Sequence, residues 1–296
     1  MTTSAFVFDH WARAHQQHVE QVLARLLPGE QILPERLHEA MRYAVLGGGK
    51  RVRALLSYAA AELAGTSRMT TDASAAAVEL IHAFSLVHDD MPCMDDDDLR
   101  RGKPSCHKQY DDATALLVGD ALQSLAFECI AETQAPQALK QVQVLAQATG
   151  SRGMCGGQSI DLQSTGKRLT RAELETMHQY KTGALIRAAT LLGAYAAPET
   201  APALIQCLEQ YSQKMGLAFQ VVDDILDATA DTQTLGKTAG KDALQDKSTY
   251  VSLLGLEEAK TLVEALYAEA LQLLAGYGAQ ADPLRGIAKF ICERPF

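Results

Sequence analysis

Cysteine is sparse in this sequence, and its spacing excludes two common kinds of scaffold. Six of the 296 residues are cysteine, and no two of them form a CxxC pair. This pattern fits neither a zinc framework nor a compact disulfide-bonded domain, and it favours free thiols in a reducing compartment. The N-terminus has no basic region followed by an apolar run, and no apolar stretch approaches the roughly 20 residues that a membrane span needs. We therefore expect a cytoplasmic protein without a membrane span.

Basic and aromatic residues are also few. The chain has 27 lysines and arginines against 36 acidic residues, a formal net charge of −9, and only 6% of its residues are aromatic. Such a chain is a poor candidate for nonspecific binding of nucleic acid, which needs a basic surface. Any site for an anionic substrate must therefore gather local basic groups or a bridging metal ion. Alanine and leucine are abundant instead, which favours helix.

Helical periodicity runs along most of the chain. Two-residue alternation bounded by hairpin turns is not found, so a sheet is not expected. No linker rich in proline, glycine or serine divides the chain. The sequence therefore predicts an all-α fold in which residues 1–296 form a single domain of about ten helices. The expected helices cover residues 5–27, 34–46, 50–63, 75–88, 113–132, 137–150, 153–163, 170–196, 202–226, 248–277 and 283–293.

Local signals predict two helix starts and two loops. Asp72 or Ser74 is expected to cap the helix over 75–88, and Thr170 with Glu173 has the spacing of a capping box. The polar segments 95–109 and 230–247 are expected to be loops.

Two clusters of acidic residues are the most unusual feature. Six carboxylates lie within the ten residues 89–98, directly after an apolar segment. A second cluster, Asp223, Asp224 and Asp227, ends another apolar segment. An acidic run is most often a solvated loop. Because both clusters end apolar helices, we expect them to face a common site instead.

Carboxylates arranged in this way bind hard divalent cations. Mg²⁺ typically takes one or two carboxylates together with substrate phosphates. Asp89 and Asp95 are six residues apart, so a straight helix would place them on different faces, but Pro92 allows the chain to turn between them. Asp223 and Asp227 are four residues apart and share one helical face. The two clusters together predict a site for metal ions and a diphosphate.

Basic residues near these clusters fit an anionic ligand. Arg100 and Arg101 follow the first acidic run, and arginine offers a planar fork that suits phosphate oxygens. Lys50 and Arg53 stand at the start of a helix, where backbone N–H groups also favour anions. The segment is not a P-loop, because no strand precedes it and the GxxxxGK[ST] pattern is missing. Further lysines are found at Lys181, Lys237, Lys241 and Lys247.

The motifs resemble those of the trans-prenyltransferase (polyprenyl synthase) family, in particular its bacterial farnesyl diphosphate synthase branch. LIHAFSLVHDDMPCMDDDDLRRGKP is similar to the family's first aspartate-rich motif, DDxxxxD, and FQVVDDILD to its second, DDxxD. GGGKRVR, GGQSIDL, KTG and DKSTY also match, in the family's order. The resemblance covers essentially the whole chain. It implies a helical bundle around a deep central cavity, a homodimer, and Mg²⁺-dependent condensation of an allylic diphosphate with isopentenyl diphosphate.

The resemblance also implies a role for each matching residue. Asp89, Asp95 and Asp223 would hold three Mg²⁺ ions, which Mn²⁺ could replace, while Asp90, Asp224 and Asp227 would stand behind them. The residues expected to contact the allylic diphosphate are Arg100, Lys181, Lys237 and Lys247. Those expected to hold isopentenyl diphosphate are Lys50, Arg53, His82 and Arg101. Thr182 and Gln220 would stabilise an allylic carbocation. Gln158 and Asp161 match a pair that lines the family's site, while Lys241 and Arg294 are given no role.

Product length is expected to depend on Phe84 and Ser85, which precede Asp89 by five and four residues. In the family, an aromatic residue followed by a small one at these positions implies a fifteen-carbon product, farnesyl diphosphate. Geranylgeranyl and geranyl diphosphate synthases are the alternatives within the family. A terpene cyclase would leave Lys50, Arg53 and Arg101 unexplained, and a noncatalytic partner subunit would not be expected to keep both acidic motifs.

Overall fold

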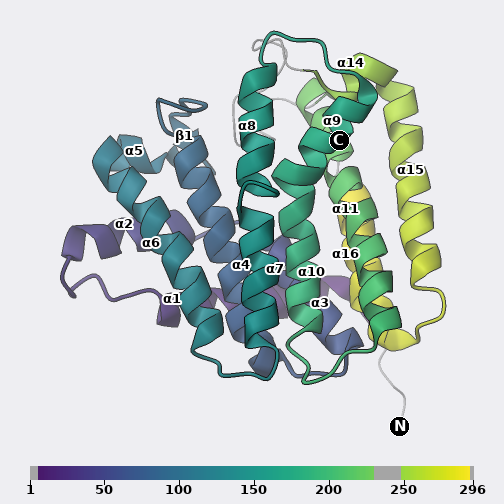
Figure 1. Ribbon diagram of the computed structural model, residues 1–296, viewed down its shortest axis with the longest axis horizontal. Coiled ribbons are helices and arrows are strands. Elements are labelled where there is room, and N and C mark those ends of the chain that lie inside the picture. Colours follow the sequence, from purple (N-terminus) through teal and green to yellow (C-terminus); the bar gives the residue numbers. More distant parts are fainter. Residues whose placement is uncertain (1–5, 230–247, 294–296) are drawn as a thin grey trace.

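Helices form nearly all the regular structure of the protein (Figure 1). The computed structural model describes residues 6–229 and 248–293. The first half contains α1 (Phe8–Leu26), α2 (Glu35–Val45), α3 (Val52–Leu63), α4 (Arg68–Asp89), β1 (Leu99–Arg100), β2 (Lys103–Pro104), α5 (Cys106–Gln109), α6 (Asp112–Ala131) and α7 (Ala138–Thr149). The second half contains α8 (Met154–Ser164), α9 (Arg171–His178), η1 (Gln179–Gly183), α10 (Ala184–Ala194), α11 (Pro202–Thr229), α14 (Tyr250–Leu254), α15 (Leu256–Leu273), η2 (Ala279–Ala281) and α16 (Asp282–Cys292). The predicted all-α class is confirmed.

Three local expectations are wrong, each for a local reason. The helix expected over 75–88 begins at Arg68, because the hydroxyl of Ser67 accepts a hydrogen bond from the Thr70 backbone N–H at 3.2 Å; neither Asp72 nor Ser74 is its cap. The helix expected over 248–277 is divided at Gly255, whose φ of 84° cannot continue a helix. The loop expected over 95–109 contains a short antiparallel hairpin and α5.

The core is built by close packing of α3, α4, α6 and α10. α4 packs against α3, α6 and α10, and α10 also packs against α3 and α11. Gly193 of α10 lies directly against the Ser57 backbone of α3, where an added Cβ would overlap the Ser57 carbonyl. The Ser57 hydroxyl donates a hydrogen bond to the Ala189 carbonyl at 2.7 Å across the same contact. Small residues therefore let these helices approach closely.

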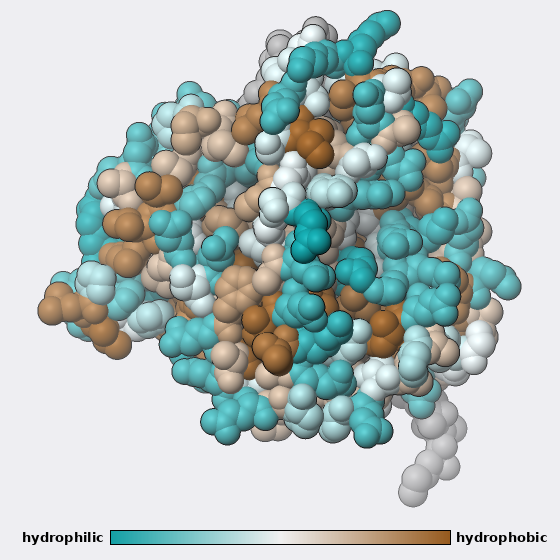
Figure 2. Space-filling model, in the orientation of Figure 1, coloured by the Kyte–Doolittle hydropathy of each residue, from teal (hydrophilic) through white to brown (hydrophobic). Residues whose placement is uncertain are grey.

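α6 is apolar in sequence but only partly buried. Among the described residues it is the one helix long and apolar enough to cross a membrane by length and composition, and 44% of that window is buried in the protein. The expectation that no apolar stretch reaches this length is therefore wrong. Leu117 is exposed, and hydrophobic residues are visible on the side of the molecule where α6 lies (Figure 2).

Candidate active site

A cavity of about 1180 Å³ opens among α3, α4, α8, η1 and α11. The C-terminal ends of α4 and α11, which carry the two acidic clusters, lie at the same end of the bundle (Figure 1). The predicted site residues that line the cavity are Lys50, Arg53, His82, Phe84, Ser85, Asp89, Arg100, Arg101, Gln158, Lys181, Thr182 and Asp223. Lys237, Lys241, Lys247 and Arg294 lie outside the described residues.

The first acidic cluster turns back on itself after α4. The backbone N–H of Asp95 donates to the carbonyl of Asp89 at 2.9 Å, so the chain makes the turn that Pro92 was expected to allow. Burial raises the pKa of Asp89 to about 6; the neighbouring carboxylates of Asp95 and Asp90 also raise it, while Lys181 lowers it. A carboxylate crowded in this way gains from a nearby cation.

The buried Asp90 forms an ion pair with the partly exposed Arg100 beside this turn. Asp90 is 2% exposed, and both its oxygens accept hydrogen bonds from Nε of Arg100 at 3.1 Å. Asp97 lies 3.6 Å from Nη2 of the same arginine. Burial raises the pKa of Asp90 despite the opposing effect of Arg100. The pair fixes the guanidinium of Arg100 at the edge of the cavity, directly after the acidic turn.

A π-helical segment places Lys181 and Thr182 in the cavity wall. η1 joins α9 to α10 without a break in the chain's helical course, and the predicted capping box of Thr170 and Glu173 begins α9. Gly157 of α8 lies against the Lys181 backbone, where a Cβ would overlap it. This close approach lets Nζ of Lys181 reach Asp161 of α8 at 2.6 Å. Burial lowers the pKa of Lys181, but Asp161 and Asp89 raise it further than burial lowers it, so the ammonium stays charged.

The second acidic cluster anchors a chain of hydrogen bonds. Asp223 lines the cavity, whereas Asp224 and Asp227 are buried behind it. Asp224 accepts from the Tyr250 backbone N–H at 2.7 Å and from Nε2 of Gln220 at 3.1 Å. Oε1 of Gln220 in turn accepts from the Thr182 hydroxyl at 3.2 Å. The second cluster therefore orients the amide of Gln220 and the hydroxyl of Thr182.

The glycine-rich segment before α3 supplies a second group of cations. Gly47, Gly48 and Gly49 all have positive φ, and Nη1 of Arg101 donates to the Gly48 carbonyl at 2.7 Å. Nζ of Lys50 lies 5.9 Å from the ring centroid of Phe290 in α16. The pKa of His82 is lowered well below its usual value by burial and by four arginines, foremost Arg53 and Arg101. His82 is therefore a neutral imidazole among cations.

Two residues of this region were missed by the sequence reasoning. Arg51 is a buried arginine in the left-handed region (φ 49°), and it donates to Glu20 at 2.7 Å, to Glu79 at 3.3 Å and to the Val45 carbonyl at 2.5 Å. Glu79, 2% exposed, also accepts from the Ala54 backbone N–H at 3.0 Å. The sequence did offer one signal of this pair, because Glu79 is an acidic residue inside the apolar run of α4. This pair holds the glycine segment and the start of α3 together.

A helical bundle whose cavity gathers carboxylates and cations in this way defines a class of enzyme that binds anions together with metal ions. Comparison with known proteins identifies the family. Residues 34–274 match the family model described as polyprenyl synthetase. The chain is 48% identical over 283 residues to a farnesyl diphosphate synthase of Haemophilus influenzae, covering 94% of this chain and 96% of that protein.

Solved structures agree. An FPP/GFPP synthase from Zymomonas mobilis superimposes with a TM-score of 0.86 at 40% identity, covering 96% of this chain and 98% of that one. A geranyltransferase from Helicobacter pylori, solved with magnesium and isoprenyl diphosphate, has a TM-score of 0.85 at 30% identity over 98% of this chain and 97% of that one. The chain belongs to the polyprenyl synthetase family, so the resemblance drawn from its motifs is confirmed. It is a trans-prenyltransferase of a generally metal-dependent family whose substrates are isoprenoid diphosphates.

The Arg51–Glu79 pair gives a stability prediction. Glu79→Gln keeps the size of the side chain but removes the negative charge from a buried partner of Arg51. We expect the free energy of unfolding to fall by about 1–3 kcal/mol, measured by urea denaturation at pH 7. Glu264→Gln, on the exposed face of α15, is the matched control and should change it by less than about 0.5 kcal/mol. Equal effects of the two substitutions would contradict this account of Arg51.

Proposed function

We propose that the protein is a farnesyl diphosphate synthase. It would join dimethylallyl or geranyl diphosphate head-to-tail to isopentenyl diphosphate, releasing diphosphate at each step. The observation that carries the proposal is the meeting of Asp89 and Asp223 with two groups of basic residues around one cavity. A cavity of about 1180 Å³ has room for an apolar chain as well as for diphosphate groups. The relatives described above support the same activity.

Asp89, Asp95 and Asp223 are the residues we assign to metal binding. Oxygen donors suit Mg²⁺, and the raised pKa of Asp89, caused first by burial and then by Asp95 and Asp90, fits a donor set that is completed by a cation. We expect three Mg²⁺ ions per site, replaceable by Mn²⁺. When bound, they would supply positive charge to the diphosphate leaving group.

The basic residues assigned to the site, with the neutral imidazole of His82, divide into two groups, one for each substrate. Arg100 and Lys181 would hold the allylic diphosphate, together with Lys237 and Lys247 outside the described residues. Both described side chains are already fixed by carboxylates, Arg100 by Asp90 and Lys181 by Asp161, so little orientation remains to be lost on binding. The second group is assigned to isopentenyl diphosphate and consists of Lys50, Arg53, His82 and Arg101. As a neutral imidazole, His82 can donate one hydrogen bond without adding charge.

The reaction needs stabilisation of charge more than a strong base. The allylic carbon–oxygen bond breaks, both electrons leave with the diphosphate, and the double bond of isopentenyl diphosphate attacks the resulting carbocation. A proton is then lost to the departed diphosphate. The hydroxyl oxygen of Thr182 and the amide of Gln220 present fixed dipoles, oriented by Asp224, that favour the cation. Apolar lining residues such as Leu162 and Phe219 keep water away from it.

Phe84 and Ser85 are assigned to the floor of the cavity. Both line it, and the ring of Phe84, 6% exposed, packs edge-on against His88 with centroids 5.1 Å apart. A large ring beside a small hydroxyl leaves room for a chain of limited length. We infer that this floor stops elongation at fifteen carbons.

The state of the protein in solution is also inferred. We expect residues 1–296 to act as one prenyltransferase domain and to form a homodimer, in keeping with the family and with the exposed leucines of α6. Light scattering should then give twice the 31.9 kDa of one chain, and a monomer at working concentration would contradict the dimer.

The six free cysteines support location in a reducing compartment, the cytoplasm.

Incubation of the purified protein with Mg²⁺, dimethylallyl diphosphate and excess isopentenyl diphosphate tests the activity. We expect mainly fifteen-carbon product by mass spectrometry.

Asp89→Asn should lower kcat at least about 100-fold, because it weakens stabilisation of the leaving group. The control Asp120→Asn, on the exposed face of α6, should leave kcat unchanged. If the wild-type protein makes mainly ten- or twenty-carbon product, the proposed reaction stands but the assignment of a fifteen-carbon product is wrong. Absence of product from folded protein would indicate a noncatalytic partner subunit, and conversion of a longer prenyl diphosphate alone would indicate a cyclase.

The cavity floor is tested by changing its size. Phe84→Ala should lengthen the product beyond fifteen carbons by opening the floor, and Ser85→Phe should shorten it by filling the space. Phe127→Ala, which removes a half-buried ring outside the cavity lining, is the matched control for loss of core packing. If both floor variants give the parent's product distribution by mass spectrometry, Phe84 and Ser85 do not form the floor.

A further inference from the structure

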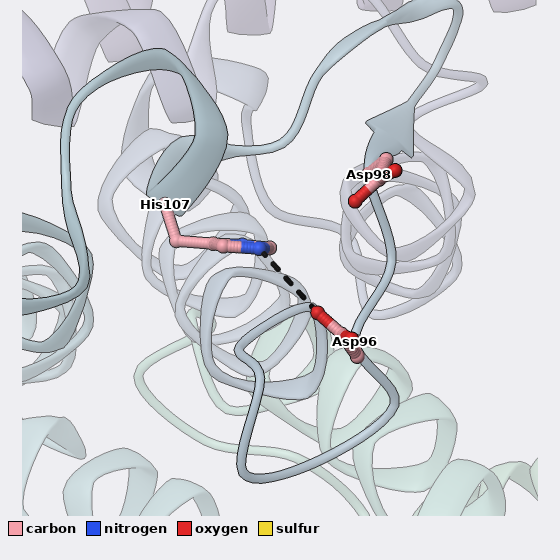
Figure 3. A group of neighbouring side chains, drawn as sticks. All are labelled: Asp96, Asp98 and His107. Atoms are coloured by element: carbon pink, nitrogen blue, oxygen red, sulfur yellow. Dashed lines mark ion pairs between the residues drawn. The ribbon is translucent and has the colours of Figure 1, made fainter.

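Three side chains outside the catalytic cavity bring metal-ligating atoms together on the loop after α4. Asp96 and Asp98 lie in the acidic run, and His107 lies in α5, after the hairpin (Figure 3). One donor atom from each of the three lies within 4.8 Å of the others. None of them belongs to the lining of the cavity described above. The mechanism proposed for the enzyme therefore gives them no task.

The imidazole of His107 is the feature that distinguishes this group from an ordinary acidic loop. Its side chain is 2% exposed, and Nδ1 lies 3.0 Å from the Ser105 hydroxyl. Nε2 is buried, has no hydrogen-bond partner, and points toward Asp96 (Figure 3). In the tautomer whose Nδ1–H donates to Ser105, Nε2 presents a lone pair to the two carboxylates. A hydrogen bond on one ring nitrogen that orients the other is typical of metal-binding histidines.

The spacing suits an ion better than a direct contact. Nε2 of His107 is 3.9 Å from Oδ1 of Asp96, which is too long for a hydrogen bond. Two metal–ligand bonds of about 2.1 Å can join donors up to roughly 4.2 Å apart. An ion can therefore bridge these two atoms, and a tetrahedral angle at the metal, which places such donors roughly 3.4 Å apart, requires them to approach by only about half an ångström. Asp98 completes the set after a small rotation of its exposed side chain, because its donor atom lies within 4.8 Å of the others.

We propose that Asp96, Asp98 and His107 bind a divalent transition-metal ion such as Zn²⁺, separate from the Mg²⁺ ions of the catalytic site. Imidazole with two carboxylates suits zinc and its neighbours, whereas Mg²⁺ prefers oxygen donors alone. Nζ of Lys108 lies 2.9 Å from Asp98 and 4.0 Å from Asp96. The lysine supplies positive charge to the same carboxylates and competes with the metal.

Occupation of this site would join both ends of the hairpin. Asp96 and Asp98 precede β1, His107 follows β2, and the strands between them carry Arg100 and the turn with Arg101. An ion bound to both ends would restrict the segment that presents these two arginines to the cavity. The site would thus stabilise the hairpin from outside the cavity.

Binding of Zn²⁺ to the metal-stripped, full-length protein tests the proposal. Calorimetry in millimolar Mg²⁺, which is present to occupy the cavity carboxylates, should show one Zn²⁺ site. His107→Gln and Asp96→Asn should each weaken it by at least about tenfold, since loss of even an outer partner of a metal ligand costs that much. His10→Gln, an exposed histidine of α1, should leave affinity unchanged. Lys108→Met should tighten binding, because it removes the competing cation.

A second probe separates this site from the exposed thiols of Cys93 and Cys155. Co²⁺ bound to nitrogen and oxygen should show only weak visible bands, without the intense near-ultraviolet band of a cobalt thiolate. Asp96 is exposed, so the Asp96→Asn variant is expected to fold even if His107→Gln does not, and circular dichroism checks both. Zn²⁺ affinity unchanged in Asp96→Asn, a thiolate band, or no binding below millimolar Zn²⁺ would each overturn the proposal.

Discussion

The site depends on opposite charges held close together inside an acidic chain. Although its net charge is −9, the protein gathers basic groups around the cavity, and carboxylates hold two of them, Arg100 and Lys181, in place. Burial lowers the pKa of Lys181, and Asp161 and Asp89 raise it again, so the ammonium stays charged in the cavity wall. Asp90 holds Arg100 in the same way. These two cations are thus oriented before substrate arrives, which reduces the reorganisation that charge separation would require.

Close helix packing makes this arrangement of charges possible. Gly157 lets α8 approach η1 closely enough for Asp161 to reach Lys181, and Gly193 lets α10 approach α3. Any side chain at Gly157 would push the lysine backbone away from its carboxylate. The π-helical turn serves the same end, because it offsets Lys181 and Thr182 from the regular helix that continues into α10.

Periodic and clustered signals could be predicted from the sequence, and contacts distant in sequence could not. The helices and the turn between Asp89 and Asp95 follow from patterns within a few residues, whereas the meeting of Lys50, Arg100 and Lys181 at one cavity was expected only from the resemblance to the family. Arg51 was missed because its partners Glu20 and Glu79 lie 31 and 28 residues away and only the fold brings them together. The hairpin after Asp98 was missed because its strands have two residues each, too few for an alternation pattern.

One helix connects substrate binding to product length. α4 carries four residues with proposed roles. His82 is assigned to isopentenyl diphosphate, Phe84 and Ser85 to the floor of the cavity, and Asp89 to the metal ions. Five residues separate Phe84 from Asp89, roughly 7.5 Å along the axis. Because α4 is packed on three sides by α3, α6 and α10, this separation does not change when loops move. On the proposed assignment, the floor and the diphosphate end of the cavity therefore stay at a fixed distance, and the side chain at the floor, rather than movement of the backbone, would determine where elongation stops.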